Sequence, residues 1–201
     1  YHGALPMTLF AVVRHGVTDW NIEGRMQGQR DTALSEQGRA LLAERRLPAE
    51  FAEFDRICSP LSRCRETAEI LLGAPCPVDD RLKELHWGAW EGQLREALRA
   101  DPASGFREQE ARGVDLTPPY GESPRQLQQR VLPLLAEVAA AGRPVLAVTH
   151  KGVIRAILCL ATGWNMLGKP PVKLDWACAH LFRLDPDGTP RIERPNMSLE
   201  P

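Results

Sequence analysis

An arginine, a histidine and a glycine stand together where a short apolar segment ends. Residues 9–13 are apolar, β-branched or aromatic, which predicts a buried strand, and Arg14, His15 and Gly16 follow directly. In an open α/β sheet, ligands bind at the carboxyl ends of the strands. Imidazole can act as a nucleophile, guanidinium pairs with phosphate oxygens, and glycine lets a ligand approach the backbone. The tripeptide therefore indicates a site for phosphate chemistry.

A second histidine follows a second apolar segment in the same way. Residues 145–148 predict another strand, and His150 comes two residues later, followed by Lys151. A helical pattern then begins, with apolar side chains on one face over residues 154–161. If the two strands are parallel neighbours, His15 and His150 meet at one edge of the sheet.

A second arginine could complete an anion site. Arg63 lies in the first turn of a helix predicted over residues 59–73. Helix N-termini favour anions because their backbone N–H groups are unpaired and carry partial positive charge. Arg14 and Arg63 together would hold a phosphoryl group through paired N–H donors. Asn21 and Gln27, in the loop after the first histidine, would add neutral hydrogen bonds.

A carboxylate suited to proton transfer lies within residues 81–92. This segment holds Glu84 and Glu91 among three aromatic rings and two glycines, which indicates a partly apolar pocket wall. An apolar surrounding favours the protonated form of a carboxyl group and suits it to general acid catalysis. Taken alone, Glu84 is more readily a solvated carboxylate than a general acid. Its company of candidate residues for phosphate chemistry favours the acid, with Glu91 as the competing carboxylate.

The remaining pattern alternates strands with helices. The apolar spacing predicts helices over residues 35–47, 59–73 and 123–142, short strands at 56–58 and 76–79, and a hairpin over 179–193. The expected N-caps are Ser35, Ser59 and Ser123, with Pro60 at a first helical position and a kink at Pro133. This order predicts an α/β fold, a three-layer sandwich with a mostly parallel sheet and an antiparallel edge.

Composition narrows the classes of partner. The 201 residues carry a net charge of −1, so no overall field attracts nucleic acid or an anionic membrane. No apolar run approaches the ~20 residues of a membrane span, and no signal peptide is evident. The five cysteines form no C-x-x-C pair, which favours a reducing compartment, and we expect a cytoplasmic protein. Histidine and cysteine spacing predicts no metal site.

Four motifs, in order along the chain, resemble those of the histidine phosphatase superfamily. They are Arg14-His15-Gly16 with the residues up to Asn21, Ser59-Pro60-Leu61-Ser62-Arg63, the segment around Glu84, and Thr149-His150-Lys151-Gly152. The similarity covers about residues 9–165 and lies in the branch of the phosphoglycerate mutases and the short broad-specificity phosphatases. It implies a phosphoglycerate mutase-like fold, and we expect one domain over residues 1–201 with 1–7 as a disordered tail. The Gly, Pro and weak periodicity of residues 100–122 predict a lid or an insertion over the site.

The resemblance also implies a mechanism without a metal or a cofactor. His15 would attack phosphorus and form a phosphohistidine, with its other ring nitrogen protonated against a backbone carbonyl. Arg14, Arg63 and His150 would neutralise the phosphoryl oxygens. Glu84 would protonate the leaving alkoxide and then activate water. The expected substrate contacts are Gly16, Asn21, Gln27, Gly28 and Lys151.

Four cationic side chains each allow two interpretations, as a substrate contact or as a solvated surface charge. Lys151 stands where the family commonly has glycine or a small residue, and its ammonium either touches an anionic substrate or reaches solvent. Arg65 is either an outer phosphate contact or a charge on the helix surface. Arg107 and Arg112, in the lid segment, either select an acidic or multiply phosphorylated substrate or are solvated.

Three functions are weighed. The leading one is hydrolysis of a small phosphorylated metabolite, by a monomer or a homodimer paired through the edge strand at 180–193. A cofactor-dependent phosphoglycerate mutase is disfavoured because such enzymes resemble longer chains between the acid motif and the late helix. A non-catalytic phospho-ligand binding module would lack the nucleophile or the acid, and both His15 and Glu84 are present.

Overall fold

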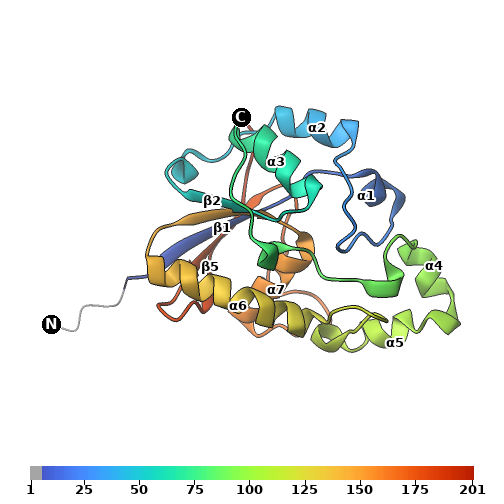
Figure 1. The fold of residues 1–201 in the computed structure, drawn as a ribbon. Helices are drawn as coiled ribbons and strands as arrows, with labels where there is room; N and C mark the ends of the chain where they lie inside the picture. The colour runs from blue at the N-terminus through green and yellow to red at the C-terminus, as the bar shows by residue number, and fades with distance from the viewer. Residues whose placement is uncertain (1–5) are drawn as a thin grey trace.

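A five-stranded sheet forms the centre of the computed structural model, which describes residues 6–201 (Figure 1). Residues 1–5 of the predicted tail lie outside the described range. The strand order is β2-β3-β1-β4-β5. In chain order the strands are β1 (Thr8–Arg14), β2 (Asp55–Cys58), β3 (Val145–Thr149), β4 (Ala179–Leu184) and β5 (Pro190–Met197).

The sheet has a parallel half and an antiparallel edge, as predicted. β3 pairs in parallel with both β1 and β2. β4 runs antiparallel to β1, and β5 runs antiparallel to β4. The predicted hairpin over residues 179–193 is therefore confirmed, and its second strand extends to Met197.

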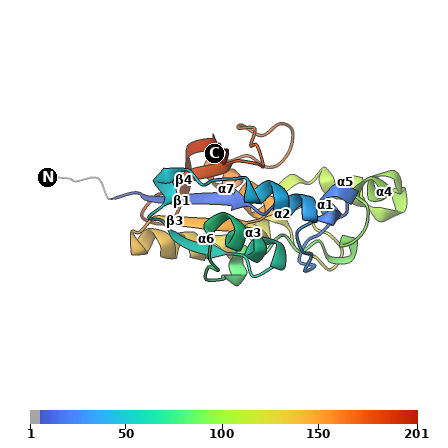
Figure 2. The ribbon, with the colours of Figure 1, turned by 90° about the horizontal axis from the view of Figure 1, so that it is seen from above.

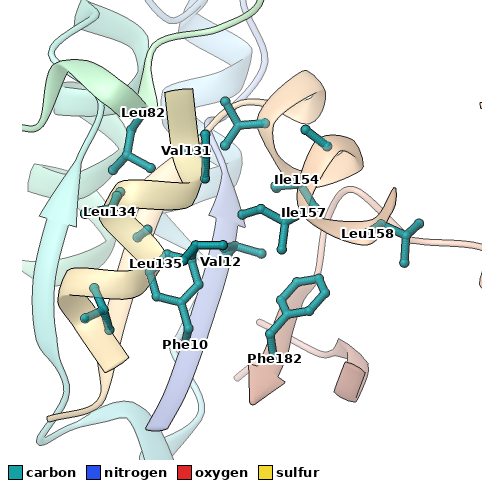
Figure 3. Close-up of a cluster of buried hydrophobic side chains, with 14 of the residues drawn as sticks. Phe10, Val12, Leu82, Val131, Leu134, Leu135, Ile154, Ile157, Leu158 and Phe182 are labelled. Atoms are coloured by element: carbon teal, nitrogen blue, oxygen red, sulfur yellow. The ribbon is translucent and has the colours of Figure 1, made fainter. Parts of the chain in front are cut away.

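Helices cover both faces of the sheet (Figures 1 and 2). α2 (Glu36–Ala43) and α3 (Ser62–Leu72) lie on one face, and α6 (Pro124–Ala141) and α7 (Lys151–Thr162) lie on the other. Alternate residues of a strand point to opposite faces. Phe10 and Val12 pack against α6 and α7 (Figure 3), whereas Ala11 and Val13 belong to a separate cluster on the other side. These two buried layers make the predicted three-layer sandwich.

The helix ends follow local chemistry. α6 begins with a capping box, in which the Ser123 hydroxyl accepts from the Gln126 N–H and the Gln126 side chain accepts from the Ser123 N–H. Pro124 occupies the first helical position, where its missing N–H costs nothing. Gly142 ends the helix at φ 69°, a left-handed conformation that glycine adopts without strain. The helix continues through Pro133.

Two predicted helix boundaries and one predicted strand are wrong. α3 begins at Ser62 with Leu61 at the N-cap. Ser59 and Pro60 therefore precede the helix, and the Ser59 hydroxyl accepts from the Leu61 N–H at 3.3 Å. α2 ends at Ala43, four residues before the predicted end. The N–H of Glu44, at the C-cap, donates to the carbonyl groups of Leu41 and Leu42 in the last turn. Residues 76–79 form no strand and make only a single bridge from Val78 to Cys58.

Short helices lie beyond the carboxyl ends of the parallel strands (Figure 1). They are α1 (Asp19–Glu23), α4 (Arg95–Ala100) and α5 (Phe106–Glu110). A small hydrophobic cluster of their own supports them, made of Met26, Trp90, Leu98, Phe106 and Leu116. Within residues 6–201 no helix has the length and hydropathy needed to cross a bilayer.

Gly38 tests the contact between α2 and the loop after β1. A Cβ at this position would strike the Val17 carbonyl oxygen, which accepts hydrogen bonds from Ser35. We expect Gly38→Ala to destabilise the protein by about 1–3 kcal/mol, as overpacking does, although alanine favours helices. Denaturant unfolding measures the change. Gln37→Ala, exposed on the same helix, should stay within about 0.5 kcal/mol of wild type. Equal effects of the two changes would contradict the assigned contact.

Candidate active site

The parallel pairing of β1 with β3 brings the two histidines together. Arg14 lies opposite Thr149 in the register, so His15 and His150 leave the sheet at the same level. The His15 N–H donates to the Thr149 carbonyl at 3.0 Å, and the two imidazole ring centroids are 5.3 Å apart, edge to face. The predicted meeting of the histidines at one sheet edge is confirmed.

The His15 ring is held in one tautomer. Its Nδ1 lies 2.6 Å from the Gly16 carbonyl oxygen, which can only accept, so Nδ1 carries the proton. Burial and the charges of Arg14 and Arg63 hold the pKa of His15 well below its usual value. The imidazole is therefore neutral near pH 7, and the Nε2 lone pair is free for nucleophilic attack.

Two arginines flank this ring. Arg63 is fully buried, and its two terminal nitrogens donate to the Arg30 carbonyl at 2.7 Å and the Gly28 carbonyl at 2.6 Å. The Nε atoms of Arg14 and Arg63 are buried and have no acceptor among the described residues. Buried donors are nearly always paired in proteins. An oxyanion next to His15 would supply the missing acceptors.

These side chains line a cavity of about 240 Å³, which we call the main cavity. Four of the five predicted catalytic residues border it, namely Arg14, His15, Arg63 and Glu84. A second cavity of about 220 Å³ also reaches Arg14 and His15. Its remaining wall includes Leu41, Leu42, Trp176 and Leu199 and is mainly apolar.

His150 lies behind His15 and has no exposed surface. Its Nε2 is 2.8 Å from the Ser59 hydroxyl, which also accepts from the Leu61 N–H. Burial, together with the charge of Arg63, holds the pKa of His150 well below its usual value. The structure thus places the fifth predicted catalytic residue against the nucleophile candidate rather than on the cavity wall.

Glu84 and Glu91 have different surroundings. The Glu84 carboxylate accepts from the Leu85 N–H at 2.7 Å and the Gly152 N–H at 3.1 Å, and it borders the main cavity. A Cβ on Gly152 would strike this carboxylate, so the glycine makes room for it. Glu91 instead accepts from the N–H groups of Gln29 and Trp87 and does not border the cavity. Its role is to hold two loops together.

Comparison with known proteins decides the family. A sequence model of the histidine phosphatase superfamily (branch 1) matches residues 10–198. The chain belongs to this superfamily. Glucosyl-3-phosphoglycerate phosphatase of Mycobacterium tuberculosis is 36% identical over 160 residues, which are 73% of this chain and 71% of the relative. A 2,3-bisphosphoglycerate-dependent phosphoglycerate mutase of Methylobacterium is 32% identical over 196 residues, covering 90% and 93% of the two chains.

Solved structures agree with this assignment. A protein described as mycobacterial hydrolase 1 superposes with a TM-score of 0.78 at 31% identity, covering 96% of this chain and 99% of that one. A mycobacterial glucosyl-3-phosphoglycerate phosphatase in complex with VO3 gives 0.75 at 30% identity, covering 95% and 100%. The chain is therefore a phosphatase-type enzyme with a phosphoglycerate mutase-like fold.

The predicted substrate contacts of this histidine phosphatase fall into two groups. Asn21 and Gln27 border the main cavity, and their side-chain oxygens contact the Thr18 hydroxyl at 3.0 and 2.7 Å, which leaves their N–H groups for a ligand. Gly28 also borders the cavity, but its carbonyl holds Arg63. Gly16 borders the second cavity, and its N–H donates to the Thr67 hydroxyl at 2.9 Å.

The structure places the four cationic side chains for which the sequence allowed two interpretations. Lys151 borders the main cavity and lies over the Trp176 ring, 5.3 Å from its centroid. Burial, with the nearby charges of Arg14 and Arg155, lowers the pKa of Lys151 to about 8. The remaining three, Arg65, Arg107 and Arg112, are exposed and do not border either cavity.

Sequence reasoning missed several residues of the site. Arg155 is four residues after Lys151 and therefore on the same face of α7, so helical spacing could have revealed it. Arg95 and Trp176 had no such signal, because each reaches the site only through the packing of a distant segment.

The lowered pKa of Lys151 predicts a pH dependence of anion binding. Inorganic phosphate is a dianion above about pH 7.5, and a dianion beside Lys151 stabilises its ammonium form. Binding must therefore recruit a proton once the free lysine has lost it. We expect phosphate affinity to fall as pH rises above 8, by up to about tenfold per pH unit. Calorimetry at constant ionic strength between about pH 7.5 and 9.5 measures this.

Lys151→Gln is the control for this titration. The variant should bind phosphate more weakly at the lower pH and lose most of the dependence. The same slope in both proteins would assign the titration to another group.

Proposed function

We propose that this enzyme hydrolyses a small phosphomonoester through a phosphohistidine at His15. The observation that carries the proposal is the hydrogen bond from His15 Nδ1 to the Gly16 carbonyl, which leaves Nε2 unprotonated at a cavity bordered by Arg14 and Arg63. A neutral imidazole with a fixed tautomer is a competent nucleophile, and a pair of guanidinium groups matches a phosphoryl group.

In the first step, His15 Nε2 attacks phosphorus and the bond from phosphorus to the ester oxygen breaks. Glu84, in its protonated form, transfers its proton to that oxygen, so the leaving group departs as a neutral alcohol. Arg14 and Arg63 stabilise the charge on the phosphoryl oxygens, where they take the place a metal ion holds in other phosphoryl transfer enzymes. His150, packed edge-on against the nucleophile, steadies its ring.

In the second step, water attacks phosphorus and the bond from phosphorus to Nε2 breaks. The Glu84 carboxylate accepts the proton of the attacking water, which restores the acid for the next cycle. Its two backbone hydrogen bonds, from Leu85 and Gly152, fix the carboxylate for both transfers.

A phosphoglycerate mutase is the second candidate, because relatives of similar identity carry either name. The two functions differ in what happens to the phosphohistidine, which a mutase returns to a hydroxyl and a phosphatase gives to water. The expected difference in chain length does not separate the two functions, because the Methylobacterium mutase is matched over 93% of its own length. The phosphatase is the leading proposal because glucosyl-3-phosphoglycerate phosphatases stand among both the sequence relatives and the solved structures that match this chain.

His15→Ala tests the nucleophile. No other side chain at the main cavity stands in the same place, so we expect phosphate release to fall by at least ~1000-fold. Phosphate release from a panel of phosphomonoesters, with a chelator present, measures the change. Brief exposure to radiolabelled substrate should label the wild type in an acid-labile, base-stable form and leave the variant unlabelled.

His86→Ala is the matched control, because His86 is partly exposed and does not border the main cavity. It should keep the wild-type rate. Retained activity in His15→Ala would refute the covalent route. Conversion of 3-phosphoglycerate to its 2-isomer, dependent on 2,3-bisphosphoglycerate and without phosphate release, would favour the mutase instead.

Glu84→Gln tests the general acid through the leaving group. A poor leaving group such as an alkoxide needs the proton, whereas p-nitrophenolate does not. We therefore expect a loss of about 10²- to 10⁴-fold on alkyl phosphates and a much smaller loss of the first step on p-nitrophenyl phosphate. Burst kinetics on the aryl substrate separate the first step from hydrolysis of the intermediate. Equal losses in the first step on both substrates would place the acid elsewhere.

A further inference from the structure

The main cavity holds far more positive than negative charge. Its wall carries six cationic side chains and two carboxylates. A phosphoryl dianion at His15 accounts for Arg14 and Arg63. Arg25 is neutralised by Glu23 and donates to the Gly92 carbonyl. Lys151, Arg95 and Arg155 remain; we call them the outer cations.

The two carboxylates of the cavity do not neutralise the outer cations. Glu84 accepts from two backbone N–H groups. Both oxygens of Glu110 are taken by Arg99, at 2.6 Å for the shortest contact. Within residues 6–201 no carboxylate lies within 4 Å of the charged groups of Lys151, Arg95 or Arg155, although all three are at least half-buried.

Aromatic rings hold the outer cations in place without cancelling their charge. Lys151 lies over Trp176, Arg95 over Trp87 and Arg155 over Trp164, each within 5.9 Å of the ring centroid. A ring contacts the face of a guanidinium and leaves its N–H edges available to an oxyanion. The three cations are thus ordered and still able to bind an anion.

The outer cations lie on the side where the leaving group must be. The general acid has to reach the ester oxygen, and Glu84 borders the main cavity but not the second one. Lys151 and Arg155 share one face of α7, and Gly152 between them carries the N–H that binds Glu84. A leaving group in contact with Glu84 therefore extends toward these cations.

We propose that the outer cations bind a second anionic group, a carboxylate or a further phosphate, on the leaving group of the substrate. This inference rests on the proposed function, since it assumes that Glu84 and His15 fix which end of the substrate is which. The substrate class is then a small phosphomonoester that bears a second negative charge. An uncharged alcohol would leave three clustered cations without a counter-charge in a partly buried cavity, which is unfavourable.

Matched substrate pairs test this preference. 3-Phosphoglycerate carries a carboxylate where glycerol 3-phosphate carries a neutral hydroxymethyl group. Fructose 1,6-bisphosphate carries a second phosphate where fructose 6-phosphate carries a hydroxyl group. We expect a higher kcat/KM for the charged member of at least one pair, by about 10- to 100-fold, the effect of one or two charge-assisted hydrogen bonds. Which pair shows it identifies the anion.

Variants assign the preference to the outer cations. Arg155→Gln and Arg95→Gln should each reduce the ratio of kcat/KM between the charged and the neutral member of a pair by about tenfold. The circular dichroism spectrum and the unfolding midpoint show whether each variant is folded. Arg155→Lys should recover part of the preference. Arg107→Gln removes an exposed cation that borders neither cavity and should change nothing.

Failure of this inference is distinguishable from failure of the proposed function. Equal kcat/KM values within both pairs, in an enzyme that needs His15, would overturn the second-anion site and leave the phosphatase standing. If the wild type released no phosphate, calorimetric binding of the same pairs would still decide it. Tighter binding of the charged member, lost in Arg155→Gln, would support the site, and equal binding would reject it.

Discussion

The site depends on the parallel pairing of β1 with β3. Because Arg14 is opposite Thr149, the first residues beyond each strand are the two histidines, and a backbone hydrogen bond from His15 to Thr149 joins them. A shift of the register by one residue would turn every side chain of a strand to the opposite face of the sheet. It would expel Phe10 and Val12 from the core against α6 and α7. The packing of the core therefore fixes the spacing of His15 and His150.

Burial of charge gives the site its chemistry. Removing Arg63 from solvent is costly, and the chain offsets the cost with carbonyl oxygens from the loop after β1 rather than with a carboxylate. Carbonyl oxygens carry no net charge, so the arginine keeps a positive field. Burial of the imidazoles, reinforced by this field and by that of Arg14, holds the pKa of His15 and of His150 low, and the field attracts an anion to the same place. One arrangement thus keeps the imidazole neutral and favours its substrate.

The local sequence pattern was sufficient to predict the strands and helices and the candidate site residues adjacent to them. Arg14, His15 and His150 were predictable because they adjoin strands with an unmistakable apolar pattern. The start of α3 was not, because the Ser59 hydroxyl contacts both the Leu61 N–H and His150, and the contact with His150 depends on tertiary packing. Arg95 and Trp176 were missed for the same reason, since their place at the site depends on how loops fold against each other.

The small hydrophobic cluster under α4 and α5 separates two tasks of the fold. Met26, Trp90, Leu98, Phe106 and Leu116 pack with one another and join the main core through Trp87. The wall of the main cavity that this cluster supports can therefore change its side chains with little effect on the sheet that aligns His15. Such modularity makes this wall evolvable: one small core can be remodelled while the sheet edge that carries Arg14, His15 and His150 keeps its geometry.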